Sequence, residues 1–110
     1  MKESAVIIQT TTNDQQTASK IASILLDAKK VACIQLENIE SYFWWEGKVQ
    51  SSKELRLSVK TVKSLSHEVI SIIKANHNYS LPEIIEIAIT DTTTEYLAWI
   101  IKETNQPVAH

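Results

Sequence analysis

The chain has 110 residues, of which 44% are hydrophobic and 22% are charged, and its formal net charge is −2. These values are typical of one soluble globular domain with its own core, and they exclude the basic surface by which proteins bind nucleic acid or anionic membranes. The single glycine excludes phosphate-binding loops of the P-loop and dinucleotide type, which need several glycines.

The chain also has a single cysteine, Cys33, so no disulfide can form within it and a reducing compartment suits it. An acidic residue, Glu3, precedes a short apolar run at the N-terminus. That run is too short for the core of a signal peptide or for a membrane span. We therefore expect a cytoplasmic protein without membrane contact.

The first elements in chain order are a strand and a helix. Residues 5–9 form a nearly continuous apolar run, which is typical of a strand buried on both faces. Asn13 or Asp14 can cap the helix that follows. Its apolar residues recur at helical spacing, namely Ala18, Ile21, Ala22, Leu25 and Ala28.

A long hairpin follows. Residues 31–36 predict a strand whose apolar phase changes at Ile39, and this change indicates a bulge or bend near residues 37–38. Residues 41–48 contain four aromatic side chains and the glycine, Gly47, which we expect at the turn. The return strand, residues 49–61, alternates between apolar and polar side chains, as a strand covered on one face does.

The last third predicts a helix, a strand and a helix. Ser64 can cap the first of these helices, which ends around residues 76–78 before Pro82. Three isoleucines at alternating positions mark a strand over residues 85–89. Thr92 and Glu95 have the spacing of a capping box, ahead of a helix lined by Leu97, Ile100 and Ile101.

The predicted order is β-α-β-β-α-β-α. Two right-handed βαβ units that share an antiparallel hairpin give an α+β, ferredoxin-like split β-α-β sandwich. The first strand, buried on both faces, suits a central position in the sheet. Residues 1–110 then form a single domain, and residues 105–110 are expected to be a frayed tail.

The hairpin is too long for a domain of this size. Its strands of about 13 residues span roughly 40 Å at about 3.3 Å per residue, whereas a compact domain of this length is about 35 Å across. Its far end should therefore overhang the domain and expose aromatic side chains. Such an edge invites pairing with another chain, and a closed homo-oligomer satisfies it.

Five sequence fragments together resemble the CutA divalent-cation tolerance proteins. They are Val31-Ala32-Cys33, Ser41-x-Phe43-x-Trp45-x-Gly47, Glu54 with Lys60-Thr61, His77-x-Tyr79-x-x-Pro82-Glu83, and Tyr96-Leu97-x-Trp99. The resemblance covers essentially the whole chain. It implies a homotrimer of ferredoxin-like subunits, similar in assembly to the PII signalling proteins, and a link to tolerance of divalent metals, copper especially. The chain departs from the family pattern at Phe43, where tyrosine is usual, and at Asn78, where proline is usual.

Cys33 and His77 are the candidate metal ligands, since a thiolate and an imidazole suit copper or zinc. Two ligands do not complete a tetrahedral site, and the chain has no Cys-x-x-Cys or His-x-x-x-His pair. Cys33 lies in an apolar strand, where a free cysteine is usually a small buried hydrophobe. His77 follows a helix, where a histidine can also serve as a cation at the C-terminus.

The resemblance further implies a pocket between neighbouring subunits, formed by Trp45, Glu54, Lys60, His77, Tyr79 and Glu83. Such a set can bind an anion or a small metabolite, or carry out acid–base chemistry. Glu54 and Lys60 lie six residues apart, roughly 20 Å along a strand, so they cannot meet within one chain. Salt bridges across a subunit boundary are the simpler role for both.

Phe43, Trp44 and Trp45 are the expected trimer contacts. Trp44 and Trp45 can in principle stack on nucleic-acid bases, but the acidic balance of the chain argues against this. The sequence thus predicts a cytoplasmic homotrimer that binds copper or another divalent metal and acts in the metal-ion response, with no cofactor that it requires. The alternative is a PII-like signalling trimer that binds a small metabolite between subunits. We expect no enzyme, because no nucleophile–base pair is visible.

Overall fold

A computed structural model describes residues 3–104 of the chain. The predicted order of elements is confirmed, with one short 3-10 turn, Lys63–Leu65, added before the second helix. The predicted tail, residues 105–110, lies outside the described part. The elements are β1 (Ala5–Thr12), α1 (Gln15–Asp27), β2 (Cys33–Trp45), β3 (Lys48–Val62), α2 (Ser66–Asn76), β4 (Ile84–Ala88) and α3 (Thr94–Thr104).

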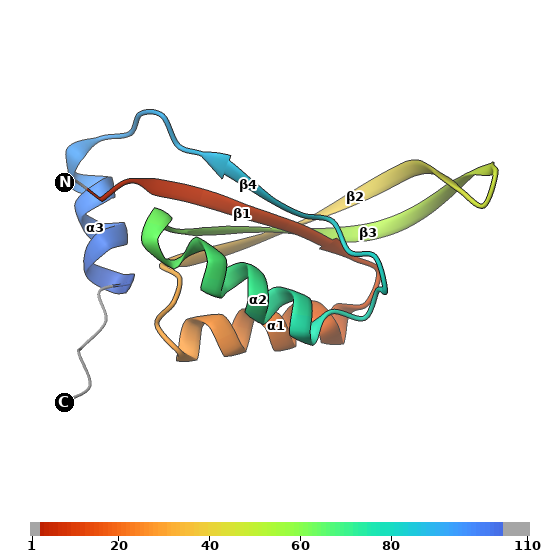
Figure 1. The fold of residues 1–110 in the computed structure, drawn as a ribbon, viewed down its shortest axis with the longest axis horizontal. Coiled ribbons are helices and arrows are strands. Elements are labelled where there is room, and N and C mark those ends of the chain that lie inside the picture. The colour runs from red at the N-terminus through yellow and green to blue at the C-terminus, as the bar shows by residue number, and fades with distance from the viewer. Residues whose placement is uncertain (1–2, 105–110) are drawn as a thin grey trace.

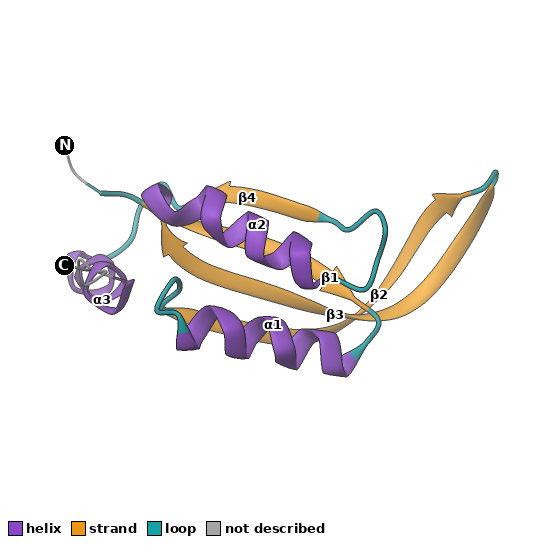
Figure 2. Cartoon of the chain, turned by 60° about the horizontal axis from the view of Figure 1, so that its bottom comes forward, coloured by secondary structure: helices purple, strands orange, loops and turns teal. Residues whose placement is uncertain are grey.

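The strands form one four-stranded sheet in the order β2-β3-β1-β4, and every neighbouring pair is antiparallel. The expected central place of β1 and the ferredoxin-like α+β sandwich are both confirmed. Helices α1 and α2 lie side by side against one face of the sheet (Figure 2). Among the described residues, no helix is both long and apolar enough to cross a membrane.

The core lies between these two helices and the sheet. Its sheet side is built from fully or almost fully buried β-branched and leucine side chains of β1 and β3, and its helix side from the apolar stripes of α1 and α2. Asp14 caps α1, because its carboxylate accepts hydrogen bonds from the Thr17 amide at 3.1 Å and from the Thr17 hydroxyl at 2.7 Å. The Thr17 hydroxyl contributes most to lowering the pKa of Asp14.

The β2–β3 hairpin extends well beyond the rest of the sheet. β1 pairs with β3 only as far as Thr12 opposite Leu55, while β2 follows β3 to its tip. We call residues 39–54 the overhang. It projects from one end of the molecule, whose longest dimension is 48 Å (Figure 1). The overhang predicted from strand lengths is therefore confirmed within a single chain.

A two-residue turn closes the hairpin. Glu46 and Gly47 have φ angles of 52° and 79°, and two central residues with positive φ fit the twist of an antiparallel pair. Nothing lies within 4 Å of the position that a Cβ on Gly47 would take, so the backbone angle and not a lack of space favours glycine there.

Of the bulge or bend predicted near residues 37–38, the structure has the bend: the pairing of β2 with β3 stays one-to-one from Cys33 to Trp45, and the hairpin curves where it leaves the sheet (Figure 2). Two local predictions, both of helix caps, were wrong. Ser64 does not cap α2, because it lies in the 3-10 turn and its hydroxyl donates to Glu3 at 2.7 Å. Thr93 rather than Thr92 caps α3, since its Oγ1 accepts the Tyr96 amide at 3.2 Å.

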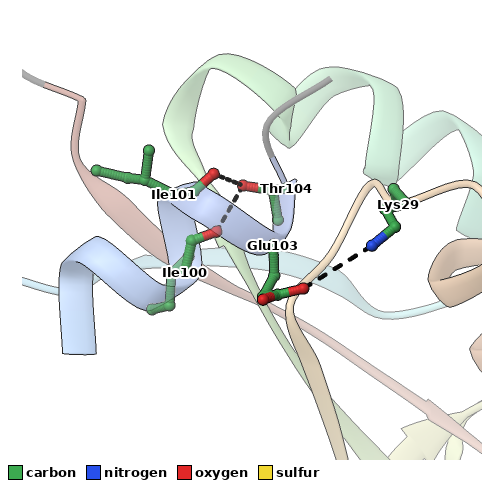
Figure 3. A network of polar contacts seen from close by, with 5 residues as sticks. All are labelled: Lys29, Ile100, Ile101, Glu103 and Thr104. Carbon is green, nitrogen blue, oxygen red and sulfur yellow. Dashed lines mark hydrogen bonds and ion pairs between the residues drawn. The ribbon is translucent and has the colours of Figure 1, made fainter. Parts of the chain in front are cut away.

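Helix α3 packs at the end of the sheet opposite the overhang (Figure 1). Its buried Ile100 forms a second small core with residues at the start of β1 and the end of β3, Ala5 and Val62. Close to its C-terminus, Glu103 pairs with Lys29 of the α1–β2 connection, with 3.8 Å between Oε1 and Nζ (Figure 3). The Thr104 hydroxyl donates to the carbonyl of Ile100 at 2.7 Å.

The face of the sheet away from α1 and α2 has no covering helix along most of its length (Figure 2). Side chains that are paired across two strands point to the same face. Ile7 therefore shares this uncovered face with Ile87, and Gln9 shares it with Ile85. Ile85 and Ile87 are exposed, although isoleucine is usually buried. The β4 side of the uncovered face is thus apolar without a partner in one chain, whereas β3 contributes Arg56, Ser58 and Lys60 to the same face.

Candidate functional site: the hairpin groove

An open groove of about 760 Å³ lies between the overhang and the loop that follows α2. That loop, between α2 and β4, runs beside the base of the overhang (Figure 1). We call this feature the hairpin groove. The residues of its lining that matter for its chemistry are Ser41, Phe43, Trp45, Glu54, Tyr79 and Glu83.

Glu54 is the central acidic residue of the groove. Only 8% of its surface is exposed, and its two carboxylate oxygens accept hydrogen bonds at 2.6 Å from the Ser41 and Tyr79 hydroxyls. Ser41 can reach Glu54 because it lies on β2 two residues from Ile39, the residue paired with Glu54. Burial, together with the bond to Glu54, raises the pKa of Tyr79, so its phenol stays protonated and donates.

His77 holds the loop in place from behind the groove. Its Nδ1 accepts the backbone N–H of Tyr79 at 3.0 Å, so the ring proton lies on Nε2, which donates to the carbonyl of Thr11 at 2.9 Å. Burial lowers the pKa of His77 and favours this neutral ring. The expected role as a cation at the helix C-terminus is therefore wrong: His77 ends α2 as a neutral bridge between β1 and Tyr79.

Asn78 contributes to the same bridge. Its Oδ1 accepts from the Thr12 hydroxyl at 2.6 Å, and its amide donates to the Asn13 side chain at 3.0 Å. Asparagine in place of the usual proline thus ties the loop to the end of β1 by hydrogen bonds. Phe43, the other departure from the family pattern, lines the groove with an apolar ring.

The predicted pocket residues divide into two places within one chain. Trp45, Glu54, Tyr79 and Glu83 line the hairpin groove, and His77 packs against Tyr79 with 5.0 Å between ring centroids. Lys60 lies near the other end of the sheet, where its Nζ is 3.3 Å from the Tyr96 hydroxyl. The inference that Glu54 and Lys60 cannot meet within a chain agrees with these contacts.

Cys33 and His77, the two candidate metal ligands, are also apart. Cys33 begins β2 opposite Lys60, whereas His77 binds the far end of β1. Both ring nitrogens of His77 are hydrogen-bonded, so a metal would have to displace one of these bonds. Within residues 3–104, no three His, Cys, Asp or Glu side chains gather as a possible metal site.

The sequence did not single out the residues that position this site. Ser41 and the threonines at the end of β1 make the decisive contacts, but hydroxyl residues in strands are common and carry no distinctive spacing. Ser41 was part of the family fragment Ser41-x-Phe43-x-Trp45-x-Gly47, but nothing in the sequence connected its hydroxyl with Glu54. Thr10 and Thr12 are completely buried, which the sequence pattern could not indicate for polar side chains.

Comparison with known proteins places the chain in a family. Residues 6–103 match the model of the CutA1 divalent ion tolerance protein family. The chain is 37% identical over 101 residues to the divalent-cation tolerance protein CutA of Pyrococcus horikoshii, an alignment that covers 92% of this chain and 99% of the relative.

Solved structures agree in fold. The crystal structure of CutA1 from Ehrlichia chaffeensis superposes with a TM-score of 0.89 at 29% identity, covering 96% of this chain and all of that one. A structure from Archaeoglobus fulgidus, described as a periplasmic divalent cation tolerance protein CutA, gives a TM-score of 0.88 at 36% identity, covering 92% of this chain and 99% of that one. This chain belongs to the CutA1 divalent ion tolerance family.

Proposed function

We propose that this protein acts in the response to divalent metal ions as a cytoplasmic homotrimer that binds copper or another divalent cation. The observation that carries the proposal is the family match across residues 6–103. The proposal includes no catalysed reaction and no cofactor that the fold requires. The single Cys33, which cannot form a disulfide within the chain, supports the cytoplasmic location that we propose, whereas the Archaeoglobus relative is described as periplasmic.

Two surfaces of the chain support the assembly. The uncovered face of the sheet exposes Ile85 and Ile87, and the overhang exposes Phe43, Trp44 and Trp45. Large apolar side chains that are exposed in groups mark interaction sites in soluble proteins. A closed ring of identical chains would cover both surfaces at once, because each chain brings the same two surfaces to its neighbours.

Cys33 and His77 remain the proposed metal ligands. Since they lie apart within one chain, a site that used both would need them from different subunits. A thiolate and an imidazole suit copper and zinc better than magnesium or calcium. A metal at His77 would also release the Tyr79 amide or the Thr11 carbonyl from its hydrogen bond.

Isothermal titration of Cu(II) into the purified protein tests the metal proposal. We expect saturable binding that weakens at least about tenfold, or about 1.4 kcal/mol, in His77→Ala and in Cys33→Ser. His67→Ala is the matched control, because His67 lies exposed on α2. Equal affinity of the wild type and both ligand variants would remove these residues as ligands, and an absence of binding would contradict the proposed metal role.

A second candidate function rests on the hairpin groove. Its volume of about 760 Å³ lies within the range of small-molecule sites, and its polar groups converge on Glu54. We propose as the alternative a PII-like signalling trimer that holds a small metabolite in this groove, beside a neighbouring subunit. Native mass spectrometry of gently purified protein tests it: a mass excess that disappears after denaturation favours the alternative, and an unliganded mass in all preparations opposes it.

A further inference from the structure

The two ring nitrogens of His77 differ in their suitability for a metal. Nε2 carries the ring proton, which it donates to the Thr11 carbonyl at 2.9 Å, and it lies 3.2 Å from the Thr10 hydroxyl oxygen. Both threonines are buried. Nδ1 carries the lone pair, which accepts the backbone N–H of Tyr79 at 3.0 Å. Metals bind a ring nitrogen through its lone pair, so Nδ1 can act as a ligand atom as it stands, whereas Nε2 would first have to lose its proton.

The contact on the other side of the ring supports the same nitrogen. Histidines that bind metals in proteins almost always donate their second ring N–H to a backbone carbonyl, a carboxylate or a water molecule. The bond from Nε2 of His77 to Thr11 is of this kind. Thr11 belongs to β1 and pairs with Arg56 of β3, so its carbonyl is held in the sheet. His77 is therefore oriented as a metal ligand through Nδ1.

Nδ1 binds either the Tyr79 amide or a metal, because it has one lone pair. Tyr79 is also held at its other end, where its hydroxyl donates to Glu54 at 2.6 Å. The amide can leave Nδ1 only when the backbone between His77 and Tyr79 turns, and this turn moves the Tyr79 side chain. A hydroxyl about 3.6 Å from its acceptor is no longer hydrogen-bonded, so a shift of about 1 Å breaks the bond to Glu54.

Asn78 adds contacts to the same arrangement of the loop. Its Oδ1 accepts from the Thr12 hydroxyl at 2.6 Å, and its amide donates to the Asn13 side chain at 3.0 Å. A turn of the backbone at Asn78 also moves this side chain. We use the name loop latch for the hydrogen bonds of Asn78 to Thr12 and Asn13 and of Tyr79 to His77 and Glu54.

We propose that a metal binds Nδ1 of His77 and opens the loop latch, so that metal binding and the latched loop exclude each other. This inference rests on the proposed metal function and deepens it, because it names the ligand atom and the segment that responds to the metal. A ligand shifts an equilibrium between two states by its difference in affinity for them. Every contact that is made only in the latched loop therefore weakens metal binding, and the metal in turn loosens that contact.

Tyr79→Phe tests the latch without removing the ligand. It keeps the ring that packs against His77, with 5.0 Å between ring centroids, and removes the hydroxyl that binds Glu54. Isothermal titration of Cu(II) should show binding about tenfold tighter than in the wild type, because the variant removes a hydrogen bond to a carboxylate that only the latched state makes. Tyr96→Phe is the matched control. It removes a hydroxyl near Lys60, at the other end of the sheet, and should leave the affinity unchanged.

Equal or weaker Cu(II) binding by Tyr79→Phe would overturn the proposal. Asn78→Ala is the second variant, for the case that Tyr79→Phe does not fold. It removes the bonds to Thr12 and Asn13 and should bind Cu(II) at least about threefold more tightly than the wild type. A wild-type affinity in this variant would count against the latch in the same way.

Hydrogen exchange of the wild type, followed by mass spectrometry, is a second measurement. A ligand that only stabilises the fold slows exchange in the segment that it binds. An opened latch has the opposite effect, because the Tyr79 amide loses its acceptor. We expect residues 77–83 to exchange at least about threefold faster with saturating Cu(II), and we expect no change on Cu(II) addition in His77→Ala. Slower exchange of this segment in the wild type would contradict the proposal.

The outcomes separate this inference from the proposed function. If the wild type binds Cu(II) through His77, with no gain in Tyr79→Phe and slower exchange of residues 77–83, the metal function stands and the latch fails. If the wild type does not bind Cu(II), or if His77→Ala binds it equally well, the proposed ligand and the latch fail together.

Discussion

Two valines of β3 show how differently the two halves of the molecule are built. Val59 lies where β3 runs between β2 and β1 under the helices, and it is completely buried, whereas Val49, ten residues earlier in the overhang, is 59% exposed. The same strand, with the same kind of side chain, thus passes from a packed core to an exposed surface that no part of the chain covers. One chain provides a partner layer for the first half and none for the second.

The comparison separates two sources of stability. Burial of a valine or leucine side chain contributes about 1.5–3 kcal/mol, and the sandwich half gains this within one chain. The rings of the overhang gain it only when another molecule covers them. We therefore expect substitutions in the sandwich to act at any protein concentration, and substitutions in the overhang to act through assembly.

The largest effect is expected in the sandwich, for Leu57→Ala. Leu57 is completely buried between the sheet and the helices, and truncation of a buried leucine costs about 2–5 kcal/mol. Chemical denaturation monitored by circular dichroism should show this loss independently of protein concentration. A loss below about 1 kcal/mol would contradict the placement of the core.

Trp45→Ala tests the overhang and should come next. If the ring is buried by a neighbouring subunit, stability falls by several kcal/mol per chain, about 2–4 kcal/mol for an interface anchor. The loss should grow as the protein is diluted, because assembly depends on concentration. An unchanged melting temperature at every concentration would place Trp45 outside any interface.

His77 links the end of β1 to the loop that carries Tyr79, and its titration should make the stability of the protein depend on pH. Because burial lowers its folded-state pKa below the ordinary 6.5, the unfolded chain binds more protons just below that pH. The stabilisation from neutral His77 is therefore complete above about pH 6.5 and is lost as the pH falls through the folded-state value.

His77→Gln should flatten this dependence and cost about 1–3 kcal/mol at neutral pH, because the Tyr79 amide or the Thr11 carbonyl loses its partner. Urea denaturation between pH 5 and pH 8 measures both effects. His67→Gln, on the exposed side of α2, is the control. A pH dependence that persists in His77→Gln and disappears in His67→Gln would assign the titration to the wrong histidine.

The smallest effect is expected at the tip of the overhang, for Gly47→Ala. The φ angle of 79° at Gly47 strains any residue with a Cβ, so we expect a loss of about 1 kcal/mol. Gly47→Asn should cost less, since asparagine tolerates positive φ. Thermal melts of the two variants check the order, and a more stable alanine variant would contradict the turn geometry.

The sequence predicted most where periodicity and length carry the information. The alternation of Leu55, Leu57 and Val59 indicated a strand covered on one face, and the lengths of β2 and β3 indicated the overhang. It failed where the outcome depends on tertiary contacts. Thr92 and Thr93 are both acceptable caps by residue type, and the structure uses Thr93. Ser64 does not cap a helix, because its hydroxyl donates a hydrogen bond to Glu3.

The candidate site was also predictable only in part, because the sequence indicates which residues belong to it but not their tertiary contacts. The family resemblance named Glu54, Tyr79 and Glu83, and these do line one groove. No sequence signal could show that both ring nitrogens of His77 form hydrogen bonds and that the ring is neutral. Its partners are the backbone carbonyl of Thr11 and the backbone amide of Tyr79, and every residue type carries such groups. Lys60 was grouped with the site by resemblance, and one chain keeps it at the other end of the sheet.

In the proposed assembly, other copies of the chain cover the overhang and the uncovered face of the sheet. Light scattering coupled to gel filtration at micromolar concentration measures whether the protein assembles in this way. We expect a mass three times that of the 12.4 kDa chain, and dissociation on dilution in Trp45→Ala. A wild-type protein that elutes and scatters as a stable monomer would contradict it.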